Sequence, residues 1–149
     1  MEARVNVITL AVSDLQRALE FYRDGLGLKS SGIIGTEFVG DEVFPPGAVA
    51  MFQLDGGLIL AVWPRANLAR DANLPLSAPS ACEFSIGHVV GSREEVDAVL
   101  AQAAAAGATV TDAGRERPWG IYSGYFQDPD GHLWEILFNP QPDWSVPHL

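Results

Sequence analysis

The chain of 149 residues contains the same pattern of predicted elements twice. Two apolar stripes at helical spacing are related by one constant offset: Leu15, Ala18, Leu19 and Tyr22 in the first half, and Val96, Val99, Leu100 and Ala103 in the second. Each stripe follows one predicted strand and precedes three. The repeat therefore predicts two βαβββ modules, each with a sheet that buries one side against its helix.

The β-branched and apolar runs set the expected strands. They are 5–12, 29–35, 48–54 and 58–64 in module 1 (about 4–64), and 82–90, 108–114, 120–127 and 132–139 in module 2 (about 81–140). Ser13 with Gln16 three residues later forms a capping-box signature for the first helix. Asp55-Gly56-Gly57 predicts a hairpin turn. Residues 65–80, rich in Ala, Pro and Asn, predict a linker or surface loop, and 141–149 a tail.

Composition restricts the partners and the compartment. With 9 basic and 19 acidic residues, the net charge of -10 disfavours binding to nucleic acid or to anionic membranes. The single Cys82 excludes an intrachain disulfide and is compatible with a reducing compartment. The start of the chain has no signal-peptide pattern, and no apolar run reaches the roughly 18 residues of a membrane span. We therefore expect a single-domain cytoplasmic protein.

Two motifs carry a family resemblance. One is Ile8-Thr9-Leu10-Ala11-Val12 running into the first helix, and the other is Asp128-Pro129-Asp130-Gly131 followed by Glu135. Together they resemble the vicinal oxygen chelate superfamily, which includes glyoxalase I, bleomycin- and fosfomycin-resistance proteins and extradiol dioxygenases. The resemblance implies an α+β fold in which two βαβββ modules form an eight-stranded curved mixed sheet. Its concave side would be a cup, and the helices would cover the outer face.

The resemblance also implies a divalent metal held by four positions in the cup. Those positions fall at Val7, about Ala61, about Ser85, and Glu135, and only Glu135 is a metal-ligand type. A divalent site needs at least three such groups. We therefore expect that the metal site is lost and that no cofactor binds. His88 could become a second ligand if a bulge turned it inward, but Phe84 and Ile86 share its parity and favour a core or supporting role.

Strand alternation separates the residues of the cup from those beneath the helices. Leu133, Glu135 and Leu137 should lie on one face, with Trp134, Ile136 and Phe138 on the other. The candidate ligand-binding residues are Val7, Thr9, Phe52, Ala61, Trp63, Ser85, Trp119 and Tyr122. Trp119 precedes Gly120 and could stack on a flat ligand, or instead pack against Pro118 or a neighbouring chain.

Glu135 has two interpretations. It is either a buried glutamate hydrogen-bonded to Thr9, Ser85 or Tyr122, or a carboxylate whose pKa is raised by desolvation and which acts as a general base or orients a ligand. Two functions stay open accordingly. The first is binding of a small organic molecule in an apolar cup without metal. The second is a lyase, isomerase or dioxygenase that uses Glu135 alone or a metal around Glu135 and His88. Exposed edge strands give a route to a homodimer.

Overall fold

The computed structural model describes residues 1–80 and 84–141, except for the side chain of Trp119. These residues form two compact units. Unit 1 contains residues 1–80 together with Pro129–Gly131, and unit 2 contains the described residues of 84–128 and 132–141. Cys82 and most of the predicted tail lie outside the described residues.

Unit 1 is a four-stranded mixed sheet with the order β1-β4-β3-β2. Its strands are β1 (Val7–Val12), β2 (Ile33–Ile34), β3 (Val49–Gln53) and β4 (Ile59–Pro64). Its helical segments are α1 (Leu15–Leu19), which continues as a π-helical stretch η1 (Glu20–Gly25), the short turn η2 (Asp55–Gly57) and α2 (Arg65–Asp71). Only β1 and β4 are parallel. The turn η2 joins antiparallel β3 and β4 at the predicted hairpin.

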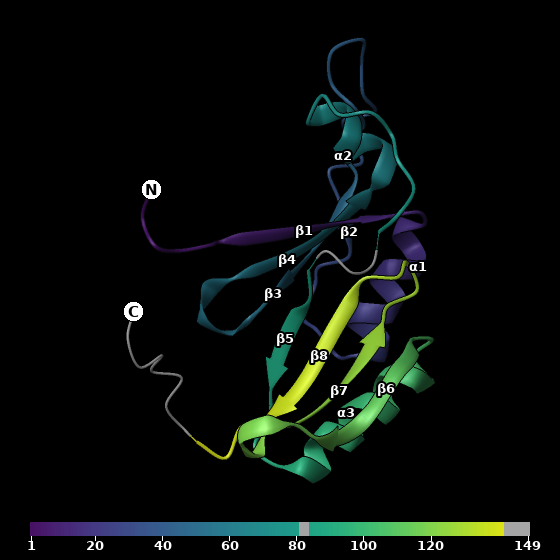
Figure 1. The fold of residues 1–149 in the computed structure, drawn as a ribbon. Coiled ribbons are helices and arrows are strands. Elements are labelled where there is room, and N and C mark those ends of the chain that lie inside the picture. The colour runs from purple at the N-terminus through teal and green to yellow at the C-terminus, as the bar shows by residue number, and fades with distance from the viewer. Residues whose placement is uncertain (81–83, 142–149) are drawn as a thin grey trace. The chain divides into compact units, whose positions relative to one another are not determined.

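Unit 2 repeats this topology with the order β5-β8-β7-β6, and Figure 1 shows β8 between β5 and β7. Its elements are β5 (Ile86–Val89), α3 (Arg93–Ala105), β6 (Thr109–Glu116), η3 (Pro118–Gly120), β7 (Tyr122–Gln127) and β8 (Leu133–Phe138). Again the first and last strands pair in parallel. The two βαβββ modules of an α+β fold are thereby confirmed. No helix within the described residues is long and apolar enough to cross a membrane.

Each helix buries its predicted stripe against its own sheet. In unit 1 the core contains Leu10, Val12, Ala18, Leu19, Tyr22, Phe52, Leu60 and Val62. In unit 2 it contains Val96, Leu100, Ala103, Phe126, Trp134 and Ile136. Side chains alternate along a strand, so the residues between these buried ones point to the side of the sheet away from α1 or α3. We call that surface of each sheet its far face.

Three local predictions need correction. The N-cap of α1 is Asp14, whose Oδ1 accepts from the backbone N–H of Arg17 at 3.0 Å, and the predicted cap Ser13 bonds to Asp130 instead. The predicted linker contains α2, because residues 65–71 are mostly Ala, Leu and Arg, which are strong helix formers. The predicted strand 29–35 reduces to two residues, since Gly32 and Gly35 both adopt positive φ.

Candidate functional site

The far face of unit 1 has a small residue at its centre. In the sheet register Ala61 lies between Thr9 on β1 and Met51 on β3. Ala61 is 2% exposed, whereas Val7 and Met51 on the same face are 47% and 37% exposed. Ala61 therefore forms a floor beneath taller neighbours. Val7, Thr9 and Ala61 lie on this face as alternation predicts, and their contact with a ligand stays a prediction.

Two aromatic candidates behave differently. Trp63 lies on the far face, next to Ala11 in the register, and its indole Nε1 is buried without a hydrogen-bond partner among the described residues. The indole N–H of Trp63 is therefore an unused donor, and leaving a buried donor unpaired costs free energy. Phe52 is fully buried on the α1 side, with its ring centroid 5.5 Å from that of Tyr22. Its predicted place in the ligand-facing set is wrong, because in the register Met51 lies beside Ala61 on the far face and Phe52 lies beside Leu60 on the opposite face.

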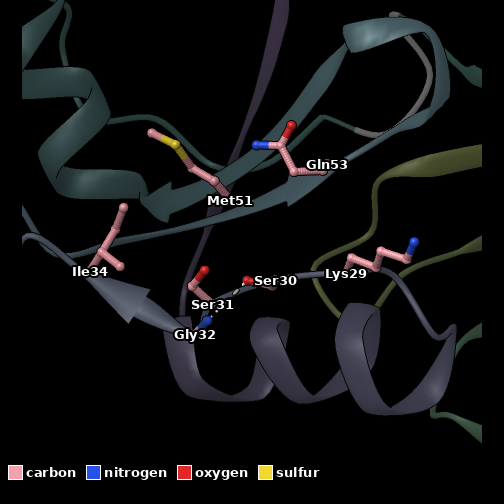
Figure 2. Close-up of a pocket in the computed structure, with 7 residues that line it drawn as sticks. All are labelled: Lys29, Ser30, Ser31, Gly32, Ile34, Met51 and Gln53. Carbon is pink, nitrogen blue, oxygen red and sulfur yellow. Dashed lines mark hydrogen bonds between the residues drawn. The ribbon is translucent and has the colours of Figure 1, made fainter.

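A pocket of about 380 Å³ lies at the edge of the unit 1 sheet. Figure 2 shows it between the segment that leads into β2 and the neighbouring strand β3, with Met51 and Gln53 projecting from β3. Its lining residues are Lys29, Ser30, Ser31, Gly32, Ile34, Met51 and Gln53. The pocket was not predicted, because the pattern of 29–35 indicated a regular strand. The glycines at 32 and 35 were the available signal, since they interrupt the strand pattern.

On the far face of unit 2, Glu135 has Tyr125 of β7 directly opposite on one side and Gly87 of β5 on the other. Burial, the charge of Glu135 and a hydrogen bond to the Glu135 carboxylate together raise the pKa of the Tyr125 hydroxyl. Gly87 carries no side chain, and a Cβ placed there would meet only Leu137 at 3.7 Å. Glu135 is therefore engaged by a phenol on one side, and its neighbour on the other side carries no side chain.

Arg117 lies beside Tyr125 and is fixed there by its own contacts. Its Nη2 donates to Asp112 Oδ2 at 2.6 Å, its Nε donates to Ser123 Oγ at 3.1 Å, and the guanidinium lies 5.6 Å from the centroid of the Tyr125 ring. Hydrogen bonds from Arg117 and Arg115 lower the pKa of Asp112. No cation was predicted on this face. The predicted strand 108–114 ended before Arg117, whereas β6 continues to Glu116, so alternation was not extended to Arg117.

The remaining candidates lie elsewhere. Tyr122 is on the α3 side, where its hydroxyl donates to Asp97 Oδ1 at 2.9 Å, which corrects its predicted place beside Glu135. His88 pairs with Ile136 and so has the opposite parity from Glu135. Ser85 is exposed and precedes β5, which begins later than the predicted strand. His132 is engaged in its turn, with Nδ1 2.6 Å from Asp128 Oδ2.

These residues do not fit the metal that the resemblance implies. Val7 and Ala61 carry no ligand atom, and His88 and Glu135 face opposite sides of the unit 2 sheet. Within the described residues there is no group of three or more His, Cys, Asp or Glu that could hold a metal ion. No chemistry is therefore assigned to a metal in this chain.

Two modules define the class of fold. In each, the first strand pairs in parallel with the last, and a helix covers one face of the sheet. Residues 4–136 match the model of the Glyoxalase/Bleomycin resistance protein/Dioxygenase superfamily, and the chain belongs to that family. It is similar to a glyoxalase-related enzyme from Fulvimarina pelagi, at 31% identity and a TM-score of 0.76 over 93% of this chain and 89% of that chain.

Two further solved structures share the fold at lower identity. One is a glyoxalase/bleomycin resistance protein/dioxygenase from Nocardioides, with 23% identity and a TM-score of 0.72 over 96% of this chain and 87% of that chain. The other is a lactoylglutathione lyase from Agrobacterium tumefaciens, with 24% identity and a TM-score of 0.65 over 93% of this chain and 95% of that chain. Among curated proteins no significant match is found.

Proposed function

We propose that this chain binds a small organic molecule on the far face of its unit 1 sheet and does so without the family metal. The pocket of about 380 Å³ at the edge of that face carries the proposal. Its volume lies at the lower end of the range for ligand pockets, roughly 300–1,000 Å³. The neighbouring far-face side chains Val7 and Met51 are apolar and exposed, and they would extend the contact area of a bound ligand.

Blocking this face tests the proposal. Thr9 is exposed on the far face, so Thr9→Trp would place an indole over that face without entering the core. The matched control is Thr36→Trp, because Thr36 is exposed in a loop. In an NMR screen of small aromatic and aliphatic compounds, we expect hits that bind the parent and the control but not Thr9→Trp. Hits that bind all three proteins equally, or a screen without hits, would contradict the proposal.

The metal-free part has a separate measurement. Protein prepared without chelator or affinity tag should contain no stoichiometric zinc, iron, nickel or manganese, and the hits should bind equally with and without added metal. Val7 and Ala61, at two of the four expected ligand positions, offer no donor atom, which supports this outcome. About one metal per chain that disappears in Glu135→Gln would overturn it.

A second function is favoured by one observation, the Tyr125–Glu135 pair with Gly87 beside it. We propose as the alternative that Glu135 acts as a general base in a lyase or isomerase reaction. A carboxylate in a partly desolvated site can remove a proton next to a carbonyl group. The test is NMR of deuterium incorporation into small ketones in D₂O. Incorporation by the parent that is absent in Glu135→Gln supports catalysis, and equal rates in both proteins exclude it.

Homodimer formation also stays a proposal. The described sheets have edge strands β1 and β2 in unit 1 and β5 and β6 in unit 2, and an edge strand gives a physical route to pairing. Analytical ultracentrifugation across a range of protein concentrations would decide between monomer and dimer.

A further inference from the structure

Lys29 differs from every other basic side chain in this protein. It is the only lysine among the nine basic residues. The eight arginines all contact a carboxylate or a backbone carbonyl: Arg4 with Glu2, Arg17 with Asp130, Arg23 with Asp24, Arg93 with Glu116, Arg115 and Arg117 with Asp112, Arg65 with the carbonyl of Ala11, and Arg70 with the carbonyl of Asp41. Within the described residues, Lys29 has no side-chain ion pair or hydrogen bond.

This unpaired cation lines the pocket of unit 1. The register places Lys29 opposite Gln53, and the backbone N–H of Gln53 donates to the carbonyl of Lys29 at 3.1 Å. The same antiparallel order places Ile34 at the other end of the lining segment, toward Met51 (Figure 2). The pocket is therefore polar at the Lys29 end and apolar at the Ile34 end.

The polar end also has hydrogen-bonding groups beside the charge. The backbone N–H of Gly32 donates to Ser30 Oγ at 3.2 Å, which fixes that hydroxyl within the lining segment. The side chains of Ser31 and Gln53 add a further hydroxyl and an amide. Such groups complete the hydrogen-bond shell of an anionic oxygen that an ammonium group attracts.

We propose that this pocket binds a small amphipathic monoanion, with a carboxylate at Lys29 and an apolar tail along Ile34 and Met51. The inference rests on the proposed binding function and specifies its ligand class. A single charge is favoured because Lys29 is the one cation among the described residues that line the pocket, and the net charge of -10 would repel a dianion more strongly. The pocket volume suits a tail of several carbons rather than a large ligand.

Three probes with the same tail separate head-group recognition from tail burial. Octanoate, octanol and octylamine are titrated into the protein by calorimetry, and octanoate should bind about tenfold more tightly than octanol. Octylamine should be the weakest. Because Lys29 is the only lysine, reductive methylation with a carbon-13 label gives one side-chain signal besides the N-terminus. That signal should shift on addition of octanoate and remain in place with octanol.

Variants assign the two ends of the pocket. Lys29→Met keeps the length of the side chain and should reduce octanoate affinity about tenfold, to that of octanol. Arg4→Met removes the same charge from an exposed residue paired with Glu2 and should leave octanoate affinity unchanged. Ile34→Ser should weaken octanoate and octanol by the same factor, because both ligands share the tail.

Equal affinity for octanoate and octanol, or an unchanged affinity in Lys29→Met, overturns the proposal. This failure is distinguishable from failure of the proposed function. If neutral hits from the screen still bind and Thr9→Trp still blocks them, the far face binds ligands without charge recognition. If neither octanoate nor any screened compound binds, both proposals fail together.

Discussion

Ser13 and Asp130 are 117 positions apart in the chain and are joined by two hydrogen bonds to one carboxylate oxygen. Asp130 Oδ1 accepts from the backbone N–H of Ser13 at 2.8 Å and from its hydroxyl at 2.9 Å. Arg17 Nη2 lies 3.2 Å from the same oxygen. The Asp130 side chain is only 3% exposed, so these donors replace its hydration. The turn that contains Asp130 is thus part of unit 1 by its contacts.

Replacing Asp130 by Ala should destabilise the protein by about 2 kcal/mol, because hydrogen bonds to charged groups contribute roughly 1.5–3 kcal/mol. Urea unfolding measures the change. Glu42→Ala is the matched control, since Glu42 is an exposed acid in a loop and should change stability by less than about 0.5 kcal/mol. Equal stabilities of the two variants would show that the turn is not held by this carboxylate.

Phe52→Ala tests the correction that moves Phe52 from the ligand-facing set into the core. Because Phe52 is fully buried against Tyr22, its truncation should cost about 3–5 kcal/mol. The adjacent Met51→Ala removes a side chain that is 37% exposed on the far face and should cost far less. Thermal or denaturant unfolding of both variants gives the comparison. A small loss for Phe52→Ala would place this ring outside the core.

Tyr125 should ionise above the usual tyrosine pKa of about 10, which ultraviolet titration of tyrosinate measures against Tyr125→Phe. In Glu135→Gln the pKa of Tyr125 should fall, because the charge of Glu135 is lost, but it should stay raised because burial is the largest cause. The folded protein holds this proton more tightly than the unfolded chain. The associated stability is therefore present below about pH 10 and is lost as the pH rises through the folded-state pKa. An unchanged Tyr125 pKa in Glu135→Gln would show that Tyr125 and Glu135 do not interact.

Gly124→Ala should be strongly destabilising. A Cβ at Gly124 would lie 2.6 Å from Leu100 Cδ1 and 2.8 Å from the carbonyl oxygen of Asp112, and the backbone atom cannot move aside. We expect a loss of about 1–3 kcal/mol or more, as for overpacking in other cores. Gly87→Ala is the control, since its added Cβ makes only ordinary contact and its φ is not positive. Comparable unfolding midpoints for the two variants would mean that β6 and α3 yield to the new methyl group.

The repeated fold could be predicted because its signals are periodic. The stripe of Val96, Leu100 and Ala103 and the alternation around Glu135 each follow one spacing over several residues, and both match the structure. Departures from a period could not be predicted in the same way. β6 runs two residues past the predicted strand end at Gly114, and Arg117 then lies over the ring of Tyr125. The glycine bends at 32 and 35 make a pocket where a strand was expected.

The parallel pairing of the outer strand with the last strand has a consequence for how each unit folds. Val7 on β1 pairs with Ile59 on β4, and Ile86 on β5 pairs with Trp134 on β8. Among the described strands, neither β1 nor β5 has another partner in its sheet. The first strand of each module therefore stays unpaired during synthesis until its partner, the last strand of the module, has been made. Bringing together strands that are far apart in the sequence slows folding. The rate-limiting step in each module should therefore be the pairing of its first strand with its last.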